Sequence, residues 1–449
     1  MLRGQRSRLA VIKNMPEDIY VPIRDEEFFY WMNLLGPFEQ RPRVAVACSG
    51  GPDSMALLVL AKAWLKHKRG SLTALIVDHG LREESRQEAK TVQNRIWNIG
   101  LRAVILSNKV ARLNSKIQET AREIRYLAIR DWCEKFGCLH LLIGHHRDDQ
   151  AETVYMRAEK GGGEDGLAGM APILELGEVR LLRPLLYFPK QRLLATVEVA
   201  GVQVVDDPSN RDERFYRSRL RKTLNSAEER VTLFREAASY ALLRQSNDLR
   251  TAECLMRACE IYPEGYAILD FAAAEDVSFG IKLRILSQLC TAIGGRRYPA
   301  KKNKVKRLAE WVWSTAPIGG RTLAGCRILP TFANRLMIFR ETELIQGPLP
   351  INKNKIHWDG RFLITSNKEM SGLEIRKLGT EGLKLILKER PKLSISHIPR
   401  LVLSTLPAIW GLEGVYTVPH LTYSRKNCTI DGRIQFAPFR PLQATRFTL

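Results

Sequence analysis

Short apolar runs alternate with amphipathic segments in the first half of the chain. The first apolar run is followed by a glycine turn and by apolar positions at helical spacing, which predicts a buried strand leading into a helix. Gly100 and Gly137 end two further amphipathic segments, as glycines often do at helix C-termini. The pattern predicts strands at 44–47, 104–106 and 139–143 and helices at 84–99 and 115–136. Because strands and helices alternate, it favours right-handed βαβ units and an α/β fold with a doubly wound parallel sheet.

The pattern changes after residue 222. Ser226 and Glu229 have the spacing of a capping box, and they open a long helical region that runs to about Ser314. From Gly319 onward, short strand-like segments are separated by prolines and glycines. We therefore expect an N-terminal extension at 1–40, an α/β domain at 41–222, a helical domain at 223–314 and a small mixed β domain at 315–449.

The charge of the chain points to a polyanionic partner. Its 449 residues carry a net charge of +22, and each lysine or arginine that displaces a counterion adds affinity for nucleic acid. A basic surface that binds nothing, or one that binds anionic lipid, would have the same composition. The longest apolar runs are far shorter than the ~20 residues of a membrane span, so we expect no integral membrane protein and no membrane partner.

The cysteines and the N-terminus bear on the compartment. Eight cysteines in a chain of this length do not form a small-domain disulfide framework, and no secretory signal is visible, which favours the cytoplasm. Cys133 and Cys138, like Cys254 and Cys259, lack the C-x-x-C spacing of zinc and redox sites, and we expect them to be packing residues. The first dozen residues are basic and slightly resemble an organellar transit segment. We expect instead a disordered extension, or a true start at Met15.

The turn after the first predicted strand has the composition of a phosphate site. Glycine allows a sharp turn and a close approach of the backbone to an anion, and the N-terminus of the next helix attracts negative charge. A carboxylate beside such a turn is repulsive unless a divalent cation lies between them, so Asp53 predicts magnesium on a pyrophosphate group. An ordinary serine–glycine turn with a helix cap is the alternative. The residues concerned are Ser49, Gly50, Gly51, Pro52, Asp53 and Ser54.

Polar residues also follow two later predicted strands. Asp78 and His79 come after one apolar run, and the segment 144–153 comes after the strand at 139–143. The carboxyl ends of strands in an open parallel sheet lie at one edge, where ligands bind. We therefore expect these segments to lie beside the glycine turn.

The segment 144–153 mixes histidines with carboxylates. Magnesium prefers oxygen ligands, so we assign Asp148 or Asp149, together with Asp53, to magnesium and to orienting the nucleophile. His145 is interpreted as a polar contact or a proton carrier. Catalytic zinc, or capping of the following helix by one of the two aspartates, are the alternatives.

These motifs occur in an order that resembles the tRNA(Ile)-lysidine synthase family. The turn itself looks like the pyrophosphate loop of the ATP α-hydrolases, which cleave ATP between its α and β phosphates. The likeness covers about Val44 to Lys222. Its motifs are S-G-G-P-D-S at 49–54, V-D-H-G-L-R at 77–82, G-H-H-R-D-D-Q-A-E-T at 144–153, G-L-A-G-M at 166–170, R-P-L-L at 183–186, D-P-S-N at 207–210 and Y-R-S-R at 216–219.

The resemblance implies an ATP-dependent ligase that joins free L-lysine to the wobble cytidine in the CAU anticodon of an isoleucine tRNA. An adenylated base would be the intermediate, and the products would be lysidine, AMP and pyrophosphate. ATP and magnesium are implied, with ATP on the loop and beside Asp78 and His79. The catalytic residues implied are Asp53, Asp149, Arg122 and His145, and those near the substrate lysine are Glu152 and Arg183.

One segment departs from the family pattern. The family usually has R-G-S-G where this chain has Lys160 and Gly162 in a glycine-rich stretch. A lysine keeps the charge of arginine but loses its two-pronged hydrogen bonding. We expect this stretch to be a mobile lid, or a backbone segment that lies close to substrate.

Basic residues interleaved with aromatics predict a tRNA-binding surface. The densest basic cluster of the chain covers 296–307 and includes a tyrosine, which suits phosphate tracking, although a solvated loop would look the same. A homodimer is compatible with the sequence. The residues expected to bind tRNA are Arg125, Arg217, Arg219, Arg297, Lys301, Lys302 and Lys304.

Three other functions are open to such a sequence. A tRNA sulfur transferase shares the adenylation step but commonly needs paired cysteines, which this chain lacks at C-x-x-C spacing. An amide-forming synthetase would explain the loop but not the charge. A non-catalytic RNA-binding protein would not depend on Asp53.

Overall fold

The computed structural model describes most of the chain in two compact units. The described residues up to Gln245 belong to the first unit, and those from Ser246 onward belong to the second. No helix among the described residues is both long enough and apolar enough to cross a membrane. The described residues are 20–78, 84–107, 117–176, 179–205, 216–224, 226–313, 317–352, 355–366, 372–425 and 432–442.

The first unit is built on a six-stranded sheet with the order β3-β2-β1-β4-β6-β5. All neighbouring strands are parallel except the edge strand β5, which runs antiparallel to β6. The expected α/β fold is therefore confirmed, with an antiparallel edge that the sequence pattern did not predict. The strands are β1 (Arg43–Ala47), β2 (Ser71–Asp78), β3 (Arg102–Ser107), β4 (His140–Ile143), β5 (Ile173–Leu176) and β6 (Val179–Leu182).

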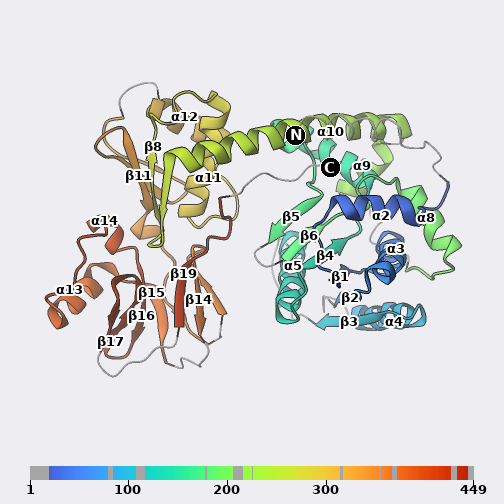
Figure 1. The fold of residues 1–449 in the computed structure, drawn as a ribbon, viewed down its shortest axis with the longest axis horizontal. Helices are drawn as coiled ribbons and strands as arrows, with labels where there is room; N and C mark the ends of the chain where they lie inside the picture. Colours follow the sequence, from blue (N-terminus) through green and yellow to red (C-terminus); the bar gives the residue numbers. More distant parts are fainter. Residues whose placement is uncertain are drawn as a thin grey trace. The chain divides into compact units, whose positions relative to one another are not determined.

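Helices cover both faces of this sheet (Figure 1). Along β1, Val44 and Val46 belong to a core cluster that contains residues of α2, α3, α4 and α8, whereas Ala45 packs in a second cluster with Ile129 and Cys133 of α5. Alternate residues of one strand thus face opposite layers, as a doubly wound sheet requires. The covering helices are α2 (Asp25–Leu34), α3 (Pro52–Lys68), α4 (Glu84–Asn98) and α8 (Lys190–Val199) on one face and α5 (Ile117–Lys135) on the other.

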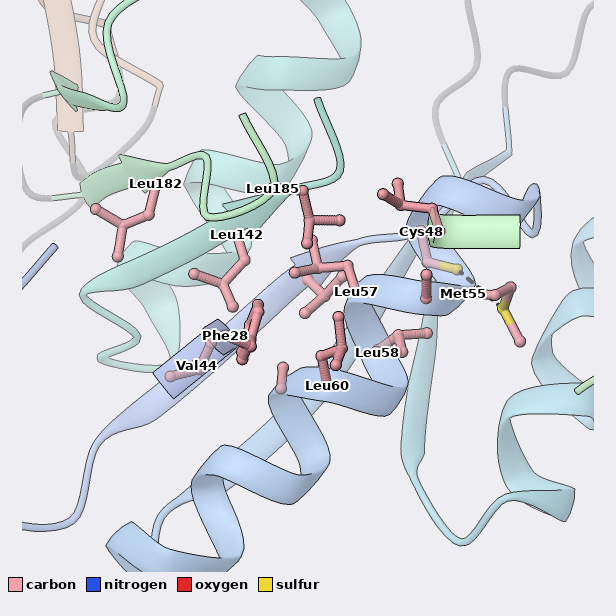
Figure 2. Packing of buried hydrophobic residues seen from close by; sticks show 14 of the residues in the cluster. Phe28, Val44, Cys48, Met55, Leu57, Leu58, Leu60, Leu142, Leu182 and Leu185 are labelled. Atoms are coloured by element: carbon pink, nitrogen blue, oxygen red, sulfur yellow. Dashed lines mark hydrogen bonds between the residues drawn. The ribbon is translucent and has the colours of Figure 1, made fainter. Parts of the chain in front are cut away.

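Helix α3 lies at the centre of the larger core. Figure 2 shows its residues Leu57, Leu58 and Leu60 among side chains contributed by strands and by α2. The helix buries residues around most of its circumference, including Met55 and Trp64. Because such a helix cannot rotate or slide without opening cavities, its first turn, which follows the glycine loop, is held in place.

The remaining helices of the first unit follow β4 and β6. Helix α10 is the longest element of the described chain, and the division between the units at residues 245 and 246 falls within it. These helices are α6 (Arg147–Glu159), α7 (Glu164–Leu167), α9 (Tyr216–Thr223) and α10 (Ala227–Ala258).

The second unit begins with a β-sheet and the helices that accompany it. The region expected to be helical up to Ser314 also contains the hairpin β7–β8, so that expectation was wrong for residues 259–270. Gly265 turns the hairpin with a φ of 80°, and the rings of Tyr262 and Tyr266 stack across it. Helices α11 (Phe279–Ile293) and α12 (Lys302–Trp313) accompany the sheet β7-β8-β11-β10-β9, made of β7 (Cys259–Tyr262), β8 (Tyr266–Asp270), β9 (Arg321–Leu323), β10 (Cys326–Pro330) and β11 (Arg335–Arg340).

Two antiparallel sheets complete the second unit. One has the order β12-β15-β16-β17-β18 and the other β13-β14-β19, in keeping with the expected mixed β character. The strands are β12 (Leu349–Pro350), β13 (Lys355–Trp358), β14 (Phe362–Ser366), β15 (Glu374–Lys377), β16 (Pro407–Gly411), β17 (Gly414–Val418), β18 (Tyr423–Ser424) and β19 (Gly432–Phe436), and the helices are α13 (Gly379–Glu389) and α14 (Arg400–Leu403).

A buried ion cluster ties these sheets together. Asp359 accepts hydrogen bonds from Arg340 at 2.9 and 3.0 Å and from Arg361 at 2.6 Å, and Arg361 also donates to the carbonyl of Thr405 before β16. Burial alone would raise the pKa of Asp359, but the two guanidiniums lower it below its usual range. Burial lowers the pKa of Arg361 to about 10, although Asp359 partly offsets the effect. One carboxylate is therefore the shared counter-charge of two buried cations.

Substitution of Asp359 should destabilise the second unit strongly. Asp359→Asn keeps the shape of the side chain and tolerates the left-handed φ of 52° at this position, but it leaves two buried guanidiniums without a counter-charge. We expect a loss of about 3–5 kcal/mol in the free energy of unfolding, measured by urea denaturation. As the pKa of Asp359 is lowered, this contribution is present at neutral pH and is lost as the pH falls through the folded-state value.

The control is an exposed ion pair of the same unit. Glu413 lies 3.0 Å from Arg425 and has a side chain 70% exposed, so Glu413→Gln should cost less than about 1 kcal/mol. Equal effects of the two substitutions would contradict the role given to the buried cluster.

Candidate active site

The glycine loop joins β1 to α3 and has the geometry of an anion site. Gly50 has a φ of 81°, and Gly51 is the N-cap of α3 with Pro52 in its first turn. A Cβ at Gly50 would lie 2.4 Å from a methyl group of Val92, so glycine is required there for both conformation and space. The first N–H groups of a helix have no acceptor within the helix. In α3 these N–H groups lie next to the glycine loop.

Side chains of the loop bind the loop itself. The Ser54 hydroxyl donates to the carbonyl of Gly51 at 3.0 Å and accepts the N–H of Ser49 at 3.3 Å. The N–H of Gly50 donates to the sulfur of Cys48 at 3.4 Å, and the carbonyl of Gly50 accepts the N–H of Val205 at 2.8 Å. The loop is thus shaped before any ligand is bound.

The pairing of β1 with β4 brings the second motif to this loop. Residues 44–47 pair in register with 140–143, so the chain that leaves β4 passes the first turn of α3. A Cβ at Gly144 would lie 3.0 Å from the carbonyl oxygen of Asp53. Glycine at 144 therefore allows the close approach that places the next residues, His145 and His146, against the loop.

His146 is buried among three carboxylates. Its Nε2 lies 3.7 Å from Oδ2 of Asp53 and 3.5 Å from Oδ2 of Asp149, and its Nδ1 lies 3.5 Å from Oδ2 of Asp148. Asp53 and Asp149 thus converge on one edge of the ring, and Asp148 lies at the other. His146, and not one of the two aspartates, is the N-cap of α6, and its N–H donates to the side chain of Asp149 in the first turn at 3.2 Å.

Electrostatic interactions within this group shift the pKa values of His146 and Asp148. Burial would lower the pKa of His146, but the charges of Asp149, Asp148 and Asp53 outweigh burial and raise it. Burial would raise the pKa of Asp148, and contacts with His146, the N–H of Lys190 and Arg230 lower it well below its usual range. An imidazolium between carboxylates reduces the repulsion that these acids would otherwise exert on a phosphate group nearby.

The oxygen atoms at this edge suit magnesium. Oδ1 of Asp53 is buried and has no hydrogen-bond partner among the described residues, and Asp149 lies beside the same ring nitrogen. Within the described parts of the chain, no group of three or more histidines, cysteines and carboxylates forms a metal site by itself. Magnesium is commonly bound by one or two carboxylates with substrate phosphates and water, so the donor set fits that ion.

A small cavity lies on the other side of His146. It has a volume of about 130 Å³. Glu152 on α6 is 5% exposed and faces it, and Asp148 is bound from the far wall by the N–H of Lys190 at 2.8 Å and by Arg230 at 3.5 Å. The lining residues are His146, Asp148, Glu152, Lys190, Gln191, Leu224 and Arg230.

Arg183 and His145 form a pair. Nε of Arg183 donates to Nδ1 of His145 at 3.1 Å, and its Nη1 donates to the carbonyl of Ala171. Because arginine only donates, Nδ1 of His145 is an acceptor and the ring proton is on Nε2 in this arrangement. Arg183 therefore supports His145, a contact that the sequence did not predict.

The glycine-rich stretch is closed by hydrogen bonds. Arg157 donates to the carbonyls of Gly166 and Gly169 at 3.0 Å, and Arg244 also donates to Gly169 at 3.2 Å. The side-chain amide of Gln150 pairs with both backbone groups of Met170. Residues 166–170 are thus held against α6 and Arg244. Lys160, which replaces the usual arginine, is exposed.

The other predicted ATP and tRNA residues are found at several places. Asp78 is buried at the end of β2 and accepts a hydrogen bond from Ser85 at 2.7 Å. Arg219 lies over the ring of Tyr216, and Arg297 lies 4.7 Å from the ring centroid of Phe439. His79 and the side chains of Arg122, Arg125 and Arg217 are outside the described residues.

Helix α12 has its basic residues on the solvent side. Val305, Leu308, Ala309 and Val312 are buried, whereas the predicted tRNA contacts Lys301, Lys302 and Lys304 are exposed. The first turn of α12 contains no acid, so its lysines oppose the positive end of the helix dipole. An anion bound there would relieve that repulsion.

Sequence reasoning missed four residues of the site. His146 was treated only as part of a mixed motif, and Arg157, Lys190 and Arg230 were not singled out. The capping position of His146, just before Arg147 opens α6, was a local signal that could have identified it. Lys190 and Arg230 contact Asp148 from segments that are distant in the sequence, and no local sequence pattern predicts such a contact.

Comparisons with known proteins show which proteins this chain is similar to. The family model of the PP-loop domain matches residues 27–228. The tRNA(Ile)-lysidine synthase of Orientia tsutsugamushi (strain Boryong) is 29% identical over 441 residues, covering 94% of this chain and 98% of the relative. That of Rickettsia akari (strain Hartford) is 31% identical over 426 residues, covering 92% and 97%. Among solved structures, a U34-tRNA thiolase from Methanococcus maripaludis matches with a TM-score of 0.41 and 21% identity over 49% of this chain and 78% of that one.

Two neighbouring glycines provide a matched test of the loop. Gly50→Ala forces a side chain into the left-handed region and against Val92, which should cost about 1–2 kcal/mol and weaken ATP binding about 5- to 30-fold. Gly51→Ala is the control, since Gly51 has an extended φ of −73° and a Cβ there would meet only the Ser49 hydroxyl at 3.6 Å. Calorimetric titration with ATP and magnesium measures both. Equal affinities for ATP in the two variants would refute the conformational requirement at Gly50.

Proposed function

The chain belongs to the tRNA(Ile)-lysidine synthase family, and from this premise we propose how its residues share the reaction. The protein is an ATP-dependent ligase that forms lysidine on an isoleucine tRNA. The observation that carries the assignment of roles is the convergence of Asp53 and Asp149 on one nitrogen of His146, between the loop and the cavity.

The loop binds the pyrophosphate part of ATP. The N–H groups at the start of α3 and the hydroxyls of Ser49 and Ser54 would face its oxygens. Asp53 and Asp149 would hold a magnesium ion, whose charge assists the departure of pyrophosphate. Asp148 has a different role. Its oxygens contact Lys190 and Arg230 on the far edge of His146, so it positions the imidazole and does not bind magnesium.

The first half-reaction adenylates the base. The 2-carbonyl oxygen of the wobble cytidine attacks the α-phosphorus of ATP, a phosphorus–oxygen bond forms, and the bond to pyrophosphate breaks. His145 carries its ring proton on Nε2 while Arg183 donates to Nδ1, so it can donate a hydrogen bond to a phosphate or base oxygen. Arg183 thus acts on the substrate through His145.

The second half-reaction consumes free lysine. Its ε-amine attacks C2 of the activated cytidine, AMP leaves, and the amine loses a proton. Glu152 is the acceptor that we propose, because it is buried, lies on the cavity wall and is one helical turn from Asp149. A cavity of about 130 Å³ is smaller than the ~300–1,000 Å³ of pockets for drug-sized ligands, so it suits an amino acid and not ATP.

The surface of α12 is the proposed site of tRNA contact in the second unit. Three lysines lie at the N-terminus of this helix without an acid in its first turn, an arrangement that disfavours the free helix and favours a bound phosphate. All seven cysteines that the structure describes are free thiols, which is in keeping with action in the cytoplasm.

The activity and the role of the carboxylates are tested together. The protein is incubated with ATP, magnesium, labelled lysine and an isoleucine tRNA transcript with CAU, beside the same transcript with UAU. Label should enter the CAU transcript alone. Asp53→Asn and Asp149→Asn should each lower the rate by about 10²- to 10³-fold, and more magnesium should be needed for half-maximal rate.

Asp131→Asn is the control for these substitutions, because Asp131 lies on α5 with a side chain 71% exposed. Full activity of Asp53→Asn at ordinary magnesium concentration would rule out its proposed role. Label in both transcripts would rule out the anticodon preference.

Charge reversal on α12 tests the tRNA surface. Replacing Lys301, Lys302 and Lys304 with glutamate should weaken tRNA binding and reduce the slope of log affinity against log salt by about 1 per lost phosphate contact. The same change at the exposed Lys66, Lys68 and Lys90 of the first unit alters the net charge equally and is the control. An unchanged salt slope in the α12 variant would remove this surface from the proposal.

A further inference from the structure

The cavity beside His146 has walls of opposite charge. Glu152 and Asp148 come from α6, whereas Lys190 and Arg230 come from the first turns of α8 and α10. Such a division matches a zwitterion, in which a carboxylate and an ammonium group lie a few bonds apart. It does not match a diamine, which carries positive charge at both ends.

The two basic residues of the cavity still have donors to offer. Arg230 uses Nε to bind the carbonyl of Leu224 at 2.8 Å and directs Nη1 toward Asp148 at 3.5 Å. Lys190 binds Asp148 through its main-chain N–H, and its ammonium group has no hydrogen bond or ion pair among the described residues. A guanidinium fixed by a carbonyl and a nearby unbound ammonium are a ready site for a carboxylate.

We propose that Lys190 and Arg230 bind the α-carboxylate of the amino acid substrate and thereby select a free amino acid over other amines. This inference rests on the proposed function, because it places the same lysine in the same cavity. The ε-amine then points back toward Glu152 on the cavity wall, where its proton is removed.

Selection by this pair has a clear chemical consequence. An amine without the carboxylate, such as 1,5-diaminopentane, presents the same reactive end but leaves two cations beside its second ammonium group. Lysinamide lacks the negative charge in the same way. A site built to bind a charged group rejects analogues that lack it, because its own polar groups are then left unpaired.

The test compares substrates across variants. Transfer to the CAU transcript is measured with L-lysine, lysinamide and 1,5-diaminopentane for the unmodified protein, Lys190→Met, Arg230→Gln and Arg230→Lys. The unmodified protein should prefer lysine by at least about 100-fold. Each neutral variant should raise the KM for lysine by about 10- to 100-fold and lower the preference by the same factor, and Arg230→Lys should restore part of it.

Arg235→Gln is the matched control, since Arg235 lies on the same helix and is exposed; it should keep the full preference for lysine. Equal losses with lysine and with the diamine in Lys190→Met would mean a structural role and would overturn the inference, as would a lack of preference in the unmodified protein.

If the proposed function is wrong, the experiment gives a different result from the one expected if only the carboxylate site is wrong. ATP–pyrophosphate exchange that depends on the CAU transcript reports the first half-reaction without any amine. If the variants catalyse exchange and lysine transfer and keep the preference for lysine over the other amines, only the carboxylate site is refuted. Absence of exchange and of transfer with every amine would refute the proposed function and this inference together.

Discussion

The pairing of β1 with β4 is the constraint on which the site depends. Because these strands are parallel neighbours with residues 44–47 opposite 140–143, the glycine loop and the start of α6 leave the sheet at the same edge. The chain reaches β4 only after β2 and β3 have been placed on the other side of β1, so a change in strand order opens a crevice there. Gly144 then lets the two segments meet without a side chain between them.

Positively charged and N–H groups offset the negative charge where the glycine loop meets the start of α6. Three aspartates near a phosphate-binding loop would repel the ligand and one another, and burial would make the repulsion worse. The chain places His146 between them, with Arg230 and the N–H of Lys190 behind Asp148. The outer aspartate is thereby neutralised by protein groups, while Asp53 and Asp149 remain directed toward the loop. Burial and ion pairing thus sort similar residues into separate tasks.

Local patterns predicted much of the first unit. The strand at β1, the glycine turn and the helices α4 and α5 follow from periodicity, glycine stops and capping, all of which depend on neighbours in sequence. The hairpin β7–β8 was missed because its two strands are short and follow a long helix directly. The contact of Arg183 with His145 was not predicted, and neither was the contact of Arg157 with the glycine-rich stretch. Such contacts depend on how distant segments meet in space, which no window of sequence reveals.

Lys190 combines two roles that are physically separate. Its main chain holds Asp148 in place, and any residue except proline offers that N–H. Lys190 also lines the cavity, where its ammonium group is the part that only lysine supplies. Mutation at this codon can therefore alter what enters the cavity while the scaffold around His146 stays intact. Natural selection could in this way explore new amine substrates at a single position, without first having to rebuild the machinery that activates the base.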